Sequence, residues 1–234
     1  MPSRVEAGLH SPKDVLSNMS PEDRKQAYKK LLVASSPIFV FQESPSRPIE
    51  FFVQGKPPRW PELALAKCRE YNEQEANAVF YGSNHFNLVD TTTKREKSVL
   101  RAFLVSLTPT YARLLSHLSV SFPALDTVQG RPEALVLKQD EVQTLKLLRD
   151  YCINLETLEL YLHKENACGL VGSASGHTQV LHDALSQVDA QLKAVSSLQT
   201  IIIRCYYDKP THEAMQLMQG FGWVVLMGDK ELPR

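Results

Sequence analysis

The chain has 234 residues, with 26 basic and 26 acidic side chains and a formal net charge of zero. Hydrophobic residues make up 43% of the sequence, which is enough to bury a core and excludes a chain that is disordered throughout. The balanced charge gives no electrostatic basis for binding nucleic acid or an anionic membrane, so we expect neither partner.

Cysteine usage and hydropathy indicate a reduced, soluble protein. The cysteines Cys68, Cys152, Cys168 and Cys205 are far apart and form no CxxC pair, so we expect buried thiols rather than a metal site. The first residues lack the apolar segment of a secretory signal, and no stretch approaches the roughly 20 apolar residues of a membrane-spanning helix. We therefore expect a protein of the cytoplasm or nucleus that needs no cofactor.

The start of the chain predicts a polar tail followed by a helix and a hairpin. Residues 1–17 are polar and are expected to be flexible. Ser20 is a suitable N-cap for a helix that begins at Pro21 and ends near residue 35. Residues 38–42 and 49–55 are rich in β-branched and aromatic residues, which predicts two short strands that pair as a hairpin.

A second helix is predicted over residues 61–80, with an apolar stripe that includes Cys68. We expect Gly82 to end this helix in the left-handed conformation. The aromatic residues on either side of the glycine are then apolar contacts around the turn, and residues 85–89 enter a strand.

From residue 94 onward, the sequence alternates between helix and strand patterns. The strand patterns that follow helices are LSVSF, LETLELYL, LQTIIIR and WVVLM. Parallel strands need a crossover of this kind between them. Residues 122–138 form a loop that holds a short strand at most. The alternation therefore predicts a parallel sheet backed by helices.

Two of these segments align position for position. CINLETLEL and VSSLQTIII share a leucine, a threonine two residues later and apolar residues at matching places, which is the rhythm of leucine-rich repeats. The repeat intervals of about 25 to 45 residues fit two arrangements, a short curved solenoid-like sheet with helices on one face or a compact three-layer sheet.

One face of the predicted sheet carries polar side chains that are candidates for exposure. These candidates are Glu156, Thr157, Glu159 and Tyr161, and later in the chain Gln199, Arg204 and Tyr206. A polar, open sheet face suits the binding of a protein or peptide. The alternative is that this face is only solvated.

Two stretches resemble fungal F-box-like proteins. Residues 19–32, MSPEDRKQAYKKLL, are similar to the opening L-P-x-E-I-R-x-x-I-Y-x-x-L-L of that family, with Ser20 in place of the usual proline and Asp23 and Ala27 in place of isoleucines. Residues 63–86 resemble the segment A-L-L-x-x-C-R-x-x-x-x-E-A-x-x-x-F-Y-x-x-N-x-F. The matching positions are Leu63, Leu65, Cys68, Arg69, Glu75, Ala76, Phe80, Tyr81, Gly82, Asn84 and Phe86.

The resemblance completes the expected α/β fold. Residues 18–92 become an F-box-like helical head with a short hairpin, and residues 93–234 become irregular helix–strand repeats that form a parallel, leucine-rich-repeat-like sheet. Within the head, we expect Arg69 and Glu75 to anchor the helix to the following turn by a charged hydrogen bond, and Asn84 to bond backbone amides there.

The resemblance also implies a function. An intact F-box-like head packs on a Skp-type adaptor of a cullin ubiquitin ligase. We therefore expect a non-enzymatic protein-interaction module, either a substrate adaptor or a scaffold subunit of an intracellular complex, and no catalytic residue.

A small-molecule-binding protein or an enzyme is the alternative. The glycine-rich residues 169–178 precede a helix, where an anion can bind, and Cys168, His177 and His182 lie in or near this stretch. The stretch lacks the Lys-Ser/Thr of a P-loop and the GxGxxG spacing. The spacing of His177, His182 and His212 is also poor for a metal site, so a surface loop is the preferred interpretation.

Overall fold

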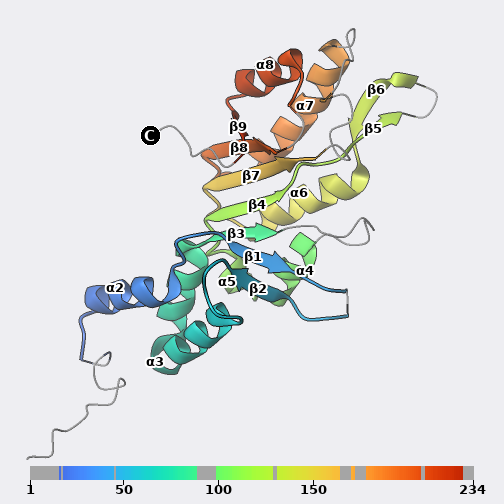
Figure 1. Cartoon of the computed structure of the whole chain (residues 1–234). Helices are drawn as coiled ribbons and strands as arrows, with labels where there is room; N and C mark the ends of the chain where they lie inside the picture. The colour runs from blue at the N-terminus through green and yellow to red at the C-terminus, as the bar shows by residue number, and fades with distance from the viewer. Residues whose placement is uncertain are drawn as a thin grey trace, which may run out of the picture.

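The computed structural model shows a mixed α/β protein built around a mostly parallel sheet (Figure 1). It describes residues 16, 18–44, 46–88, 99–128, 131–163, 170–171, 178–206 and 209–228. The helices of this part of the chain are α2 (Pro21–Leu32), α3 (Trp60–Ser83), α4 (Val99–Ser106), α5 (Pro109–Ala112), α6 (Gln139–Tyr151), α7 (Thr178–Lys193) and α8 (His212–Gly220). The strands are β1 (Ile38–Phe41), β2 (Glu50–Val53), β3 (His85–Leu88), β4 (His117–Ser121), β5 (Leu125–Val128), β6 (Arg131–Leu137), β7 (Thr157–Leu162), β8 (Thr200–Cys205) and β9 (Val224–Met227).

Helix α2 begins where the sequence predicts. The Ser20 hydroxyl accepts a hydrogen bond from the Asp23 N–H at 3.1 Å, and Pro21 occupies the first turn, where its missing N–H is not needed. Tyr28 and Leu32 are fully buried on the side of α2 that packs against α3. The remaining surface of α2 is largely polar and exposed.

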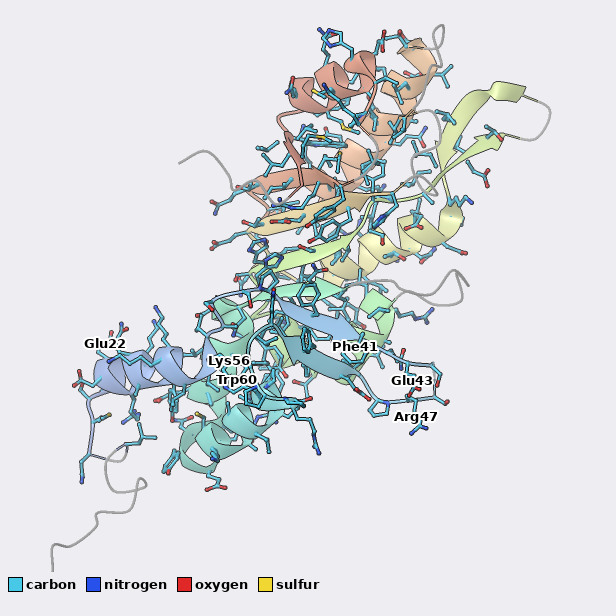
Figure 2. All side chains as sticks on the ribbon, in the orientation of Figure 1. Glu22, Phe41, Glu43, Arg47, Lys56 and Trp60 are labelled. Carbon is cyan, nitrogen blue, oxygen red and sulfur yellow. The ribbon has the colours of Figure 1, made fainter. Side chains whose placement is uncertain are left out.

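Helix α3 is longer than predicted and is interrupted at Asn72, which has φ −152° and ψ 102°. The Asn72 side chain accepts the Glu75 N–H at 3.1 Å, so it caps the second half of the helix in the manner of an N-cap. At the start of α3, Lys56 Nζ lies 5.0 Å from the centre of the Trp60 ring (Figure 2).

The prediction that Gly82 ends this helix in a left-handed conformation is wrong. Gly82 lies inside α3 and has no positive φ, and the helix ends at Ser83, before the extended residue Asn84. A β-carbon on residue 82 would lie 3.3 Å from the Leu114 carbonyl oxygen. The glycine therefore permits close packing of two chain segments rather than a change of direction.

Seven strands form one sheet in the order β2-β1-β3-β4-β7-β8-β9. The predicted hairpin is confirmed, since β1 and β2 are antiparallel neighbours, and every other pair in the sheet is parallel. The predicted parallel arrangement of β4, β7, β8 and β9 is therefore confirmed. The aligned segments are also in register, because Thr157 pairs with Thr200 and Leu158 pairs with Ile201.

The helices that connect the parallel strands lie on one face of the sheet. The parallel strands β1, β3, β4, β7, β8 and β9 lie side by side in the order in which they occur along the chain. Right-handed crossovers between such strands place every connecting helix on the same side of the sheet. Figure 1 shows α6, α7 and α8 stacked along that side. The side chains that face the helices include Phe86, Leu118, Leu158, Leu160, Ile201 and Ile203, all buried.

The sheet and its core continue from the first part of the chain into the second. Strand β3 pairs with β4, with His85 opposite His117, and one cluster of buried apolar side chains extends from Tyr28 to Trp223. The expected boundary between residues 92 and 93 falls outside the described residues, between two strands that are hydrogen-bonded neighbours.

A separate pair of strands lies between β4 and α6 along the chain. Residues expected to be mainly loop form the antiparallel pair β5 and β6, which contacts α7.

Cys68, Cys152 and Cys205 are buried free thiols, as predicted, and burial raises the pKa of Cys152 to about 12. Among the described residues, none of the helices combines the length and the apolar character that crossing a bilayer requires.

Candidate functional site: the polar face of the sheet

The sheet face opposite the helices carries a group of polar side chains on β3, β4, β7 and β8, and we call this part of the sheet the polar face. Alternate residues of a strand point to opposite faces, and partners in parallel register share a face. The polar members of this face include His85, Asn87, His117, Ser119, Thr157, Glu159, Tyr161, Arg204 and Tyr206. Towards β9 the same face becomes apolar, with Ile202, Val224 and Leu226. None of the described helices lies on this face (Figure 1).

A buried ion pair lies near the middle of the polar face. Arg204 donates from Nε to Glu159 Oε2 at 2.8 Å and from Nη2 to Oε1 at 3.2 Å, and its Nη1 reaches the Gly228 carbonyl at 2.7 Å. Glu159 is only 5% exposed, so the prediction that it is exposed is wrong. The guanidinium on the neighbouring strand covers the carboxylate.

The environment keeps Glu159 charged. Burial disfavours the carboxylate, but the contact with His117 and the hydrogen bonds from Arg204 outweigh burial and lower the pKa of Glu159 to about 2. The pair is therefore ionised at neutral pH, and it fixes the relative positions of β7 and β8 at this point of the sheet.

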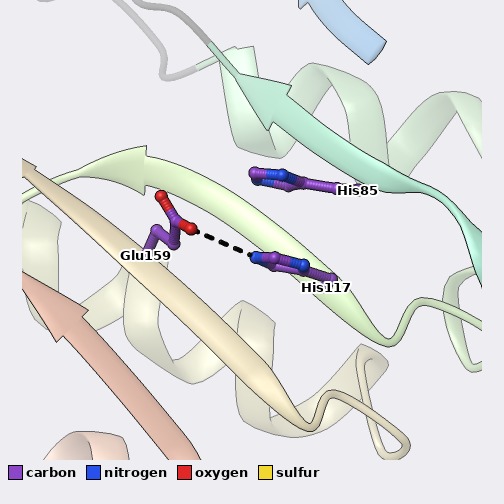
Figure 3. Close-up of side chains that lie close together, drawn as sticks. All are labelled: His85, His117 and Glu159. Atoms are coloured by element: carbon purple, nitrogen blue, oxygen red, sulfur yellow. Dashed lines mark ion pairs between the residues drawn. The ribbon is translucent and has the colours of Figure 1, made fainter. Parts of the chain in front are cut away.

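Two histidines stack beside this pair on adjacent strands (Figure 3). The rings of His85 and His117 are 3.7 Å apart and within 3° of parallel, as expected for two residues directly opposite in parallel register. His117 Nε2 lies 3.5 Å from Glu159 Oε1, and His85 Nε2 is hydrogen-bonded to the Ser119 hydroxyl. Burial, and secondly the neighbouring His117, lower the pKa of His85 to about 4, so His85 is neutral at pH 7.

Aromatic side chains continue the polar face beyond the ion pair. Asn87 Nδ2 donates to the Tyr161 hydroxyl at 2.9 Å, and the rings of Tyr161 and Tyr206 stack with centroids 5.7 Å apart. Tyr206 is 42% exposed, while Tyr161 is half-buried. The predicted residues Tyr161, Arg204 and Tyr206 are thus brought together, with Tyr206 outermost.

The same face has an apolar edge formed by the hairpin. Phe39 of β1 is in register with Asn87, and its ring lies 6.2 Å from that of Phe52 on β2. Phe52 is 50% exposed. Neither phenylalanine was predicted to belong to a site, because a phenylalanine in a strand is usually a core residue.

A cleft of about 390 Å³ opens at the amino ends of β1, β3, β4 and β7. It is lined largely by small polar residues, together with His85, His117, Glu156 and Thr157. Glu156 is exposed there, as predicted, and Gln199 is exposed in the corresponding position before β8. The two histidines therefore belong both to the polar face and to the wall of this cleft.

The motif residues between 63 and 86 that resemble F-box-like proteins have structural roles. The hydrogen-bond partners of Arg69 and Glu75 differ from the predicted ones. Arg69 donates to Asn77 Oδ1, and Glu75 pairs with Arg24 of α2 through bonds of 2.8 and 2.9 Å. The prediction that Arg69 and Glu75 anchor the helix to the following turn is wrong, because each bonds to a helix instead. Cys68, Phe80, Tyr81 and Phe86 are buried core residues.

Asn84 bonds backbone groups, but these belong to the ends of α2 and α3 rather than, as was predicted, to the turn after α3. Its Oδ1 accepts the Ala34 N–H at 2.8 Å, and its Nδ2 donates to the Leu32 and Phe80 carbonyls at 2.9 and 2.8 Å. Three bonds from one buried amide join the end of α2 to the end of α3.

The alternative site is not described by the structure. Cys168, Gly169 and residues 172–177, which include His177, lie outside the described residues. His182 and His212 are exposed on α7 and α8. His182 interacts with Asp183, with 3.4 Å between Nδ1 and Oδ1.

His85, Asn87, His117 and Ser119 were not predicted to belong to one site. A signal was present: the segments HFNL and HLSV both begin with histidine and have a polar residue two positions later. Parallel strands in register place such positions side by side, but the pairing of β3 with β4 had to be known first.

Comparisons with known protein families, with curated proteins and with solved structures gave no match. The class of the protein is therefore defined by its fold and site. It is a mixed α/β protein whose mostly parallel sheet carries its connecting helices on one face and a partly buried array of polar and aromatic side chains on the other.

Proposed function

We propose that the chain is a non-enzymatic protein-interaction module, with an F-box-like head and a leucine-rich-repeat-like body, that serves as a substrate adaptor or a scaffold subunit of an intracellular complex. The observation that carries the proposal is the polar face, which none of the described helices covers. A protein partner would bind on this face.

The repeat-like body is supported by hydrogen bonds that recur from one repeat to the next. The N–H groups of Glu156 and Thr157 both donate to the Ser116 carbonyl, and those of Gln199 and Thr200 both donate to the Glu156 carbonyl. Equivalent backbone positions thus make equivalent bonds before β7 and before β8. Stacked units of this kind present one side chain row after another on a single face.

The side chains of the polar face suit a protein partner. Exposed aromatic residues and arginine are the residue types that contribute most to protein interfaces, and here Tyr206 and Phe52 are exposed at either end of the face. The Glu159–Arg204 pair and the Asn87–Tyr161 bond hold the residues between them in fixed positions. A preorganised surface loses less conformational entropy when it binds.

The adaptor version of the proposal rests on the head. The inner side of α2 is used for packing against α3, and Leu31, which is 50% exposed, is its large apolar side chain on the outer side. Burying one leucine side chain contributes about 2 kcal/mol to the free energy of binding, whereas the charged Asp23 contributes no apolar surface to bury. We therefore expect a Skp-type adaptor to bind weakly and through Leu31.

Calorimetry with a purified Skp-type adaptor tests this version. We expect saturable binding by the intact chain that Leu31→Asp weakens at least about tenfold. Val105→Asp, an exposed change on α4, is the control and should leave affinity unchanged. Absence of binding, or equal loss in both variants, rejects the adaptor version and leaves the scaffold version.

Photo-crosslinking in cells tests the polar face itself. A photoreactive phenylalanine analogue at Tyr206 should crosslink to a discrete partner, whereas the same analogue at Tyr151 should not. These tyrosines are matched, with exposures of 42% and 39%, but Tyr151 lies at the end of α6. The recovered partner, produced in pure form, should bind Tyr206→Ala at least about tenfold more weakly than Tyr151→Ala. Crosslinking from both positions alike, or from Tyr151 alone, would contradict the proposal.

A further inference from the structure

We propose that His85, His117 and Glu159 form a binding site for a divalent transition-metal ion of the Zn²⁺ class, at the border between the polar face and the cleft. One ligand atom from each residue lies within 4.8 Å of the other two. Two imidazoles and one carboxylate are ligands that zinc accepts. The three residues come from three adjacent strands, β3, β4 and β7 (Figure 3).

The spacing between His117 and Glu159 already fits a shared metal ion. Zinc lies about 2.0–2.2 Å from nitrogen and oxygen ligands, so two ligand atoms of a tetrahedral site are about 3.3–3.5 Å apart. His117 Nε2 and Glu159 Oε1 are 3.5 Å apart. This distance is too long for a strong hydrogen bond but suits two ligands of one ion.

His117 Nε2 is a buried polar atom that makes no short hydrogen bond, since its contact with Glu159 Oε1 is 3.5 Å long. Buried nitrogens are normally paired, because an unmatched one loses its bonds to water without replacement. Coordination of a metal ion by the Nε2 lone pair would satisfy this atom.

The carboxylate is held in a way that leaves one oxygen available. Oε2 receives the shorter bond from Arg204 Nε, at 2.8 Å, whereas Oε1 receives the longer bond from Nη2, at 3.2 Å. Oε1 can therefore bind a metal ion while Arg204 stays hydrogen-bonded to Oε2 and so orients the Glu159 carboxylate. Outer partners of this kind are typical of metal-binding carboxylates.

His85 must tilt to become the third ligand. In the stacked arrangement the two ring planes are parallel, so their lone pairs run side by side and do not converge on one point. Rotation of His85 away from the Ser119 hydroxyl would aim a ring nitrogen at the ion, and the adjoining cleft of about 390 Å³ provides the space. The remaining coordination position would face the cleft and take water.

Zinc titration of the chelator-treated protein tests the site. Calorimetry should show one Zn²⁺ per chain, and His117→Ala and His85→Ala should each weaken binding at least about tenfold. His182→Ala is the matched control, since His182 is an exposed histidine beside an acidic residue, and it should bind like the unaltered protein.

Co²⁺ added to the unaltered protein gives a test that needs no variant to fold. Amide resonances of β3, β4 and β7 should broaden first, and the near-ultraviolet spectrum should lack thiolate charge-transfer bands. Three outcomes would overturn the proposal: no stoichiometric binding, binding that survives His117→Ala, or broadening centred on α7 or α8.

Discussion

Glu159 shows how a single buried charge depends on its neighbours. The carboxylate is almost inaccessible and its partner Arg204 lies on the adjacent strand. Breaking a buried pair by removing one charge is more costly than losing an exposed pair, because the other charge stays desolvated. The polar face thus contributes to the stability of the sheet.

We expect Glu159→Gln to lower the free energy of unfolding by about 2 kcal/mol, because the guanidinium keeps an acceptor but loses the opposite charge. Urea denaturation at pH 7 measures the change. The control is Glu156→Gln at the exposed neighbouring position, where the change should stay within about 0.5 kcal/mol. Equal effects in the two variants would show that the pair contributes nothing.

The pH dependence of stability should report His85. Its pKa is about 4 in the folded protein and 6.5 is the ordinary value, so unfolding takes up a proton between these limits. The free energy of unfolding should therefore fall as pH decreases from 6.5 to 4, and Glu159, with a pKa of about 2 against an ordinary 4.5, should extend the fall below 4.5.

Chemical denaturation in metal-free buffer at a series of pH values measures this. His85→Gln should remove the loss of stability between pH 6.5 and 4, while the exposed His182→Gln should keep it. A His85→Gln profile that parallels the unaltered protein in that range would contradict the assignment.

At the scale of elements, the joint between α2 and α3 is fixed by two different kinds of contact. Asn84 is 3% exposed and bonds three backbone groups, whereas the side chains of Arg24 and Glu75 are 21% and 32% exposed. Backbone groups left unsatisfied in a buried place are costly, while solvent reduces the contribution of a partly exposed ion pair.

We therefore expect Asn84→Ala to destabilise the protein by about 2–3 kcal/mol and Glu75→Gln by less than about 1 kcal/mol. Urea denaturation of both variants, with Ser83→Ala as an exposed control at the same helix end, measures the difference. A larger loss in Glu75→Gln than in Asn84→Ala would mean that charge, not the amide, holds the joint.

At the scale of the whole molecule, the continuous sheet predicts one cooperative unit. Strand β3 of the first part pairs with β4 of the second, and the buried apolar cluster passes through both. Neither part can unfold alone without exposing a strand edge and apolar side chains of the other.

The two tryptophans allow the cooperativity of unfolding to be measured separately in the first and the second part of the chain. Trp60 lies in α3 and Trp223 beside β9, so Trp223→Phe and Trp60→Phe each leave one reporter. Fluorescence in each variant and circular dichroism should give coincident urea midpoints within that variant. Transitions seen by tryptophan and by circular dichroism at separate midpoints would instead show a head and a body that unfold independently.

Several elements follow from the sequence because their causes are local. Ser20 and Pro21 start α2, the apolar β-branched run of β8 makes a strand, and the alternation of helix and strand requires parallel pairing. The aligned leucine and threonine positions of the two repeat segments also coincide with the observed register of β7 and β8. Gly82 was misjudged because its need for a small residue comes from Leu114, a distant part of the chain.

By itself, the sequence determined the kind of most elements and the parallel arrangement of the last four strands of the large sheet, because periodicity and chain connectivity set them, whereas the pair β5 and β6 was expected to be mainly loop. Only the tertiary structure decided that Glu159 is buried under Arg204, that His85 stacks on His117, and that Glu75 pairs with Arg24. Each of these contacts joins residues that are dozens of positions apart. Their environments depend on which strands and helices become neighbours, and that is a property of the packed molecule rather than of any segment.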